Sequence, residues 1–151
     1  MTLFLDLDGT LADFDTAYAA IAGQPPNRQA DDVDWQKVVA VPHFYRNLPP
    51  MHDMPLLWAY VAAYKPVVLT GVPSSIPTAK RDKEVWVEQH LGTHVLVIGC
   101  ASKDKATFCR PGDVLVDDRE KYRGLWEAAG GKWITHTDAL SSIDALRVMG
   151  Y

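Results

Sequence analysis

The sequence has little cysteine and no long hydrophobic stretch. Cys100 and Cys109 have neither CxxC spacing nor a histidine cluster beside them, which is typical of reduced thiols in a cytosolic protein rather than of a disulfide framework. No apolar run reaches the roughly 18 residues of a membrane-spanning helix. The first residues also lack the basic region and apolar stretch of a signal peptide. The sequence therefore predicts a cytoplasmic protein without a membrane partner.

An excess of positive charge is missing as well. The formal net charge is −4, and no stripe of lysine or arginine is present. These features argue against a protein that coats nucleic acid or an anionic membrane. The 151 residues show no internal repeat and are enough for one domain with its own core.

Short apolar runs rich in β-formers alternate with helical patterns along the chain. This alternation predicts a single α/β domain over residues 1–151, with a Rossmann-like parallel sheet and helices on both faces. The predicted strands are 3–7, 66–70, 94–98, 114–116 and 132–135, and the predicted helices are 12–22, 54–64, 78–91, 120–129 and 138–149.

Residues 23–50 interrupt this alternation. The segment is rich in proline and too long for a simple connection. We interpret it as a small, partly helical cap insertion after the first strand, lying over one end of the sheet. An irregular connection without a role is the alternative, and the aromatic residues Trp35, Phe44 and Tyr45 favour the cap.

Polar residues follow three of the predicted strands at the point where each strand ends. In an open parallel sheet these ends share one edge, where ligands bind. Carboxylates gathered there would repel one another unless a cation is present, and Mg²⁺ prefers such oxygen ligands. The residues concerned are Asp6 and Asp8, Thr70 and Gly71, and Asp117 and Asp118.

The order of these motifs resembles the haloacid dehalogenase (HAD) superfamily. The matching pieces are "DLDGTLADF", the threonine of "VVLTG", Lys105 in "SKDK" and "VDDR". More narrowly, the sequence is similar to the 5'-(deoxy)nucleotidase branch, through "DGTLADF", "HFYRNLPP", "KEVWVEQHLG" and "LVDDR". The resemblance implies a HAD-like fold with Mg²⁺ as cofactor.

The resemblance also implies catalytic roles for the two aspartates of the first motif. Asp6 would be the nucleophile that takes the phosphoryl group. Asp8 would be the general acid and then the general base, and its backbone carbonyl would be a metal ligand beside Asp6. Asp118 would bind Mg²⁺ directly and Asp117 through a water, or the reverse.

Three further residues would bind the phosphate by the same resemblance. They are the Thr70 hydroxyl, the Gly71 amide and the Lys105 ammonium, which would also neutralise Asp6. The nucleotidase branch commonly has serine where Gly71 stands, and often lysine where Ser74 stands.

A nearby cation could replace the lysine that is missing at Ser74. Lys80, Arg81 and Lys83 are the candidates, but a solvated helix face is the interpretation we favour for them.

Aromatic residues could form a pocket for the leaving group. Phe14, Phe44 and Tyr45 are the candidates, since aromatic rings stack on nucleobases. For Trp35 we favour a packing role, and His43 is interpreted as a surface or satisfied histidine. Packing is also predicted for Trp58, Trp86, Trp126 and Trp133.

The resulting hypothesis is a Mg²⁺-dependent phosphomonoester hydrolase with an aspartyl-phosphate intermediate, acting as a 5'-(deoxy)nucleotidase on nucleoside monophosphates. One alternative is a phosphatase of another small metabolite or of a nucleic-acid end. Another is a catalytically silent binding module. Because the predicted cap is small, a second copy of the chain could cover the site, so a homodimer is a further possibility.

Overall fold

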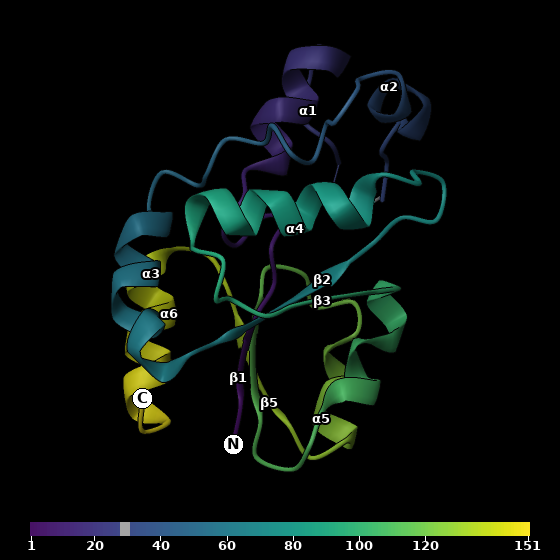
Figure 1. Cartoon of the computed structure of the whole chain (residues 1–151). Helices are drawn as coiled ribbons and strands as arrows, with labels where there is room; N and C mark the ends of the chain where they lie inside the picture. The colour runs from purple at the N-terminus through teal and green to yellow at the C-terminus, as the bar shows by residue number, and fades with distance from the viewer. Residues whose placement is uncertain (28–30) are drawn as a thin grey trace.

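The computed structural model describes residues 1–27 and 31–151, which form a parallel sheet with helices on both faces (Figure 1). The sheet has five strands in the order β3-β2-β1-β4-β5. This architecture confirms the α/β fold that the alternation of the sequence predicts. The strands are β1 (Leu3–Leu5), β2 (Val67–Gly71), β3 (Val97–Cys100), β4 (Val114–Asp117) and β5 (Lys132–Thr135).

The helices lie in two layers beside the sheet and in a group beyond one end of it. Figure 1 shows α3 and α6 on one side and α5 on the other, with α1, α2 and α4 at the top. Among the described residues, no helix combines the length and apolar character needed to cross a bilayer. The α-helices are α1 (Phe14–Ala22), α2 (Trp35–Val39), α3 (Met54–Val61), α4 (Ala79–His90), α5 (Arg123–Ala128) and α6 (Ala139–Val148), and the 3₁₀ helices are η1 (Ala62–Tyr64) and η2 (Ser102–Phe108).

Strand alternation divides the core between the two faces of the sheet. Leu3 and Leu5 of β1 belong to the larger apolar cluster, whereas Phe4 belongs to a smaller one with Trp126 and Trp133. Each large side chain buried in this way contributes about 2 kcal/mol. The run around β1 is apolar at every position because both of its faces are covered.

Strand β3 begins later than the sequence predicts. The prediction for this strand was residues 94–98, but the strand is Val97–Cys100. Gly92 has a φ of +120°, and the amide of Val95 donates a hydrogen bond to the Gly92 carbonyl. The first apolar residues of the run are therefore used in a turn rather than in the sheet.

The segment predicted to be a cap insertion, residues 23–50, follows α1 and contains α2. Helix α1 begins after Asp13, whose side chain accepts from the Thr16 amide, and ends at Gly23, which has a φ of +83°. Helix α2 buries Val38 and leaves Trp35 partly exposed. Residues 28–30 of the predicted cap lie outside the described residues.

Candidate active site

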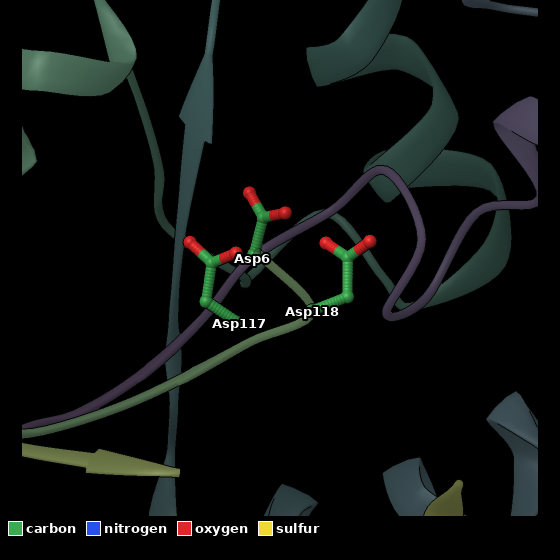
Figure 2. A group of neighbouring side chains, drawn as sticks. All are labelled: Asp6, Asp117 and Asp118. Atoms are coloured by element: carbon green, nitrogen blue, oxygen red, sulfur yellow. The ribbon is translucent and has the colours of Figure 1, made fainter. Parts of the chain in front are cut away.

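Three carboxylates meet at the carboxyl edge of the sheet. The strands β1 and β4 pair with Leu5 opposite Val116, so the residues that follow them come side by side. Ligand oxygens of Asp6, Asp117 and Asp118 all lie within 4.8 Å of one another. Figure 2 shows the three carboxyl groups projecting toward the same region. The topology thus brings together acidic residues that are more than half the chain apart.

Lys105 bridges two of these carboxylates from η2. Its Nζ lies 2.7 Å from Asp6 Oδ1 and 2.7 Å from Asp117 Oδ2. Burial acts to lower the pKa of Lys105, but the two carboxylates outweigh burial and raise it, so the ammonium stays charged. Lys103, in the same motif, is exposed. The structure therefore places Lys105 within the acidic cluster.

The cluster keeps an excess of negative charge despite this lysine. Burial, followed by the charge of Asp6, raises the pKa of Asp117 to about 6, against the opposing effect of Lys105. Hard carboxylate oxygens held this close fit a small divalent cation such as Mg²⁺. The side chains of Asp6, Asp117 and Asp118 are therefore suitable to hold one.

Asp8 lies in the turn after β1, next to the cluster. The turn depends on Gly9, which has a φ of +87° and donates its amide hydrogen to the Ala12 carbonyl. Burial raises the pKa of Asp8, Lys83 opposes this shift and Asp6 adds to it. A carboxyl group whose pKa is raised can hold a proton closer to neutral pH, as a general acid must.

Lys83 is the cation that lies beside Asp8. It is 1% exposed, and its Nζ lies 2.6 Å from Asp8 Oδ2, 3.2 Å from Thr70 Oγ1 and 2.5 Å from the Gly71 carbonyl oxygen. The interpretation of Lys83 as part of a solvated helix face is therefore wrong. Lys80 and Arg81 are exposed, as that interpretation expects.

Helical spacing carries a signal that could have identified Lys83. The buried residues of α4 recur at intervals of three and four, which is the inward stripe of an amphipathic helix. Lys83 occupies a position of this stripe, one turn before two apolar members. The buried positions are Ala79, Asp82, Lys83, Trp86 and Val87.

The end of β2 supplies Thr70 and Gly71 to the site. Thr70 is buried, and Gly71 lines the cavity. A Cβ atom at position 71 would come closer than 3.0 Å to the Ser102 hydroxyl of η2. Ser102 also lines the cavity, although no motif in the sequence selects it. A serine hydroxyl thus lies beside Gly71 from another element.

A cavity of about 350 Å³ opens onto these residues. Asp6, Asp8, Lys83 and Lys105 line its polar part. Its volume is near the lower end of the range for small-molecule sites.

The aromatic wall of the cavity differs in part from the predicted pocket. Of the three residues predicted for a substrate pocket, Phe14 and Tyr45 line the cavity and Phe44 does not. Phe44 is buried and packs edge-on against both rings, with centroids 5.6 Å from each, so it supports the wall from behind. Trp35 lines the cavity and is 41% exposed, which contradicts a purely packing role.

The remaining tryptophans are largely structural. Trp86 is fully buried, and its indole N–H donates to the Leu48 carbonyl at 2.8 Å. Trp126 packs edge-on against Phe4 with a centroid distance of 5.4 Å. Trp133 is also buried, and Trp126 and Trp133 line the cavity in addition to packing in the smaller core cluster. Trp58 is half-buried against the larger core cluster.

Known structures share this arrangement of strands and helices. The crystal structure of a hydrolase from Streptococcus pneumoniae TIGR4 superposes with a TM-score of 0.56 at 12% identity, covering 97% of both chains. L-2-haloacid dehalogenase from Xanthobacter autotrophicus superposes with a TM-score of 0.52 at 12% identity, covering 96% of this chain and 87% of that one. The chain has a haloacid dehalogenase-like fold. The same dehalogenase with chloropropionic acid covalently bound matches equally well.

The HAD-like fold is the extent of what these similarities establish. No protein-family model and no curated protein sequence matches the chain. Because one fold supports many reactions, the chemistry has to be argued from the side chains of this site.

Proposed function

We propose that this HAD-like protein is a Mg²⁺-dependent phosphomonoester hydrolase. The observation that carries the proposal is the cluster of Asp6, Asp117 and Asp118 within 4.8 Å, bridged by Lys105. A nucleophilic carboxylate, a cation site and a fixed ammonium charge are then available to one phosphoryl group.

The first step transfers the phosphoryl group to the protein. A carboxylate oxygen of Asp6 attacks phosphorus, and the bond between phosphorus and the ester oxygen breaks. The protonated carboxyl group of Asp8 gives its proton to that departing oxygen, so the product leaves as a neutral alcohol. Asp6 is then an aspartyl-phosphate and Asp8 a carboxylate.

The second step restores the protein. The Asp8 carboxylate removes a proton from a water molecule, whose oxygen attacks phosphorus. The bond from phosphorus to Asp6 breaks, and inorganic phosphate is released. Asp8 ends protonated and Asp6 ionised, which is the starting state.

The side chains of Asp6, Asp117 and Asp118 and the backbone carbonyl of Asp8 would hold the magnesium ion. When bound, Mg²⁺ would reduce the repulsion between the phosphate and Asp6.

The phosphate oxygens require donors besides the metal. The Thr70 hydroxyl, the Gly71 amide and Lys105 are our proposed contacts. We add the Ser102 hydroxyl, which lies beside Gly71 and lines the cavity. The Ser102 hydroxyl would replace the side-chain donor that a serine at position 71 would supply and that Gly71 lacks.

The substrate that we propose is a 5'-(deoxy)nucleotide. A 350 Å³ cavity suits a small phosphomonoester, and Trp35 offers exposed ring surface at its wall. Tyr45 is less suitable for stacking, because Lys83 Nζ lies 4.4 Å from its ring centroid and occupies that region. A different small phosphate ester remains the alternative substrate within this chemistry.

Dehalogenation, the activity named for one structural neighbour, fits this site less well. Displacement of a halide needs a nucleophilic carboxylate, but it needs neither an acid for the leaving group nor a cation site. Here Asp8 lies beside Asp6, and two further carboxylates complete the cluster. Both features serve a charged phosphoryl group.

The test is phosphate release in the presence of Mg²⁺ from nucleoside monophosphates, sugar phosphates and p-nitrophenyl phosphate, with a 2-haloacid as a comparison. We expect release from the phosphate esters, preference for 5'-nucleotides, and loss of at least about 1000-fold in Asp6→Asn. Absence of release from every ester by the Mg²⁺-loaded protein would overturn the proposal and favour a silent binding module. Halide release instead would indicate a dehalogenase.

A further inference from the structure

We infer that Lys83 is a positioning residue that holds the Asp8 carboxyl group in place for proton transfer to the leaving group. The inference rests on the proposed phosphomonoester hydrolysis and adds a residue to it. Lys83 comes from α4, which is separate from the strand ends that carry the other site residues.

The contacts of Lys83 fix its ammonium group. A lysine ammonium has three N–H donors. Three acceptors surround this one at 3.2 Å or less, namely Asp8 Oδ2, Thr70 Oγ1 and the Gly71 carbonyl oxygen. The ring of Tyr45 covers the group from a further side. Because all of its donors are used in hydrogen bonds, the Lys83 ammonium group is held in one position.

This ammonium group determines where the Asp8 carboxyl group lies. The turn at Gly9 leaves Asp8 at the edge of the cavity, and 24% of its side chain is exposed. Among the described residues, Lys83 is the partner that directly binds an oxygen of Asp8, and the buried Oδ1 has no hydrogen-bond partner there. Without Lys83 the carboxyl group would lose the contact that sets its orientation relative to Asp6. Small displacements of this kind reduce proton transfer strongly.

The Lys83 ammonium group also fixes the orientation of the Thr70 hydroxyl, which is a proposed phosphate contact. Because Lys83 can only donate, Thr70 Oγ1 accepts from it and keeps its own hydrogen for another acceptor. The Gly71 carbonyl is the nearest acceptor for that hydrogen, at a long distance of 3.4 Å. A phosphate oxygen would be a better partner. Lys83 therefore links the residue that delivers the proton to a residue that binds the phosphate.

The leaving group provides a readout that a purely structural role would not change. A p-nitrophenolate ion leaves without a proton, whereas the alkoxide of a nucleoside 5'-phosphate needs one. Loss of proton delivery must therefore slow the alkyl ester far more than the aryl ester. Loss of folded protein lowers kcat/KM for both esters by the same factor.

The experiment compares kcat/KM for a nucleoside 5'-monophosphate and for p-nitrophenyl phosphate in Lys83→Met. We expect a loss of about 100-fold for the nucleotide and less than about 10-fold for the aryl ester. Asp8→Asn should show the same selectivity. Lys80→Met, an exposed lysine on the same helix, is the matched control and should leave both values unchanged.

Equal losses for both esters, or no loss for either, would overturn the inference. Lys83→Gln, measured by the same ratio, replaces Lys83→Met if the methionine variant does not fold. If the unsubstituted protein hydrolyses neither ester, the proposed function fails. If it hydrolyses both and the ratio is unchanged in the Lys83 variants, only the role of Lys83 fails.

Discussion

Gly71 and Ser102 lie close together beside the proposed phosphate-binding edge. A Cβ atom at position 71 would come within 3.0 Å of Ser102 Oγ and within 3.4 Å of Ser102 Cβ. A side chain at position 71 would therefore displace the Ser102 hydroxyl from its present place. In the proposed site, the hydroxyl donor would come from η2 rather than from the end of β2.

The close approach of positions 71 and 102 predicts what happens when glycine and serine are exchanged between them. Gly71→Ser alone should lower kcat/KM by about 10-fold or more, because the new side chain forces Ser102 aside. The double variant with Ser102→Gly should recover most of the activity, since the hydroxyl then comes from position 71. Steady-state kinetics of the two single variants and the double variant measure the coupling. Strictly additive losses would contradict the close approach of the two positions.

His136 is a buried histidine close to the site. Its Nδ1 lies 2.8 Å from Ser142 Oγ, and burial lowers its pKa from the usual 6.5, although Asp53, Asp138 and Asp6 act to raise it. Below pH 6.5 the unfolded chain binds a proton here before the folded protein does. His136 therefore makes the fold less stable as the pH falls from 6.5 toward the lowered pKa.

The corresponding prediction concerns the slope of stability with pH. In His136→Gln, the free energy of unfolding should fall less steeply between pH 6.5 and about 5 than in the unsubstituted protein. Urea unfolding at several pH values measures this slope. An unchanged slope would show that His136 does not titrate differently on folding. Asp117 contributes in the opposite direction, because its raised pKa favours the folded state as the pH falls.

Helix α4 contacts both the 23–50 segment and the candidate active site. One residue before Lys83, the buried Asp82 accepts from His43 Nδ1 at 2.9 Å and from Arg46 at 3.0 Å. Both partners belong to the 23–50 segment. The histidine is half-exposed and satisfied by this contact, as the sequence analysis expects.

Removal of this contact should loosen the 23–50 segment. We expect Asp82→Ala to lower the free energy of unfolding by about 2 kcal/mol, because it removes the buried carboxylate that accepts hydrogen bonds from His43 and Arg46. Urea denaturation gives the value. Asp144→Ala on α6 is the control, since its pair with Arg147 is exposed and should contribute less than about 0.5 kcal/mol. Similar losses in the free energy of unfolding for both variants would contradict a stabilising role of the buried Asp82 contacts.

Element order was predictable because apolar runs and helical stripes are local signals. The sequence predicted the sheet and the meeting of Asp6 with Asp117 and Asp118, which follow from the rule that parallel strand ends share an edge. Helix α2 lies in the segment that was predicted to be partly helical, but its bounds were not predicted. The short η2 was missed, and β3 was placed too early because a turn uses part of the apolar run. Lys83 was only one of three candidate cations and was assigned to a solvated face, although the inward stripe of α4 indicates its burial. Ser102 was not recognised, since its place beside Gly71 depends on how separate elements pack.

At the scale of the whole molecule, the acidic cluster concentrates unfavourable charge in the folded state. Ligand carboxylates within 4.8 Å repel one another, and Lys105 neutralises this charge only in part. A cation that binds there should therefore stabilise the folded protein against the unfolded chain, where the carboxylates are far apart.

Magnesium should raise the midpoint of thermal unfolding. At a concentration ten times its dissociation constant, Mg²⁺ would increase the free energy of unfolding by about 1.4 kcal/mol. This increase corresponds to a rise of roughly 4 °C in the midpoint for a chain of this size. Differential scanning calorimetry in MgCl₂, with NaCl at matched ionic strength as the control, measures the shift. Asp118→Asn should reduce it. An equal shift in that variant would place the bound ion elsewhere.

The central position of β1 also affects when the molecule can fold during its synthesis. Leu3 pairs with Val114, and the Thr2 amide donates to Asp113, across a separation of 111 residues. A ribosome that has made only the first two thirds of the chain therefore presents β1 with one open edge and without Lys105 or Asp117. Contacts so distant in sequence form slowly, and an open hydrophobic strand can associate with other chains in the meantime. The active site and protection from aggregation are thus completed together, when β4 emerges and adds to the sheet.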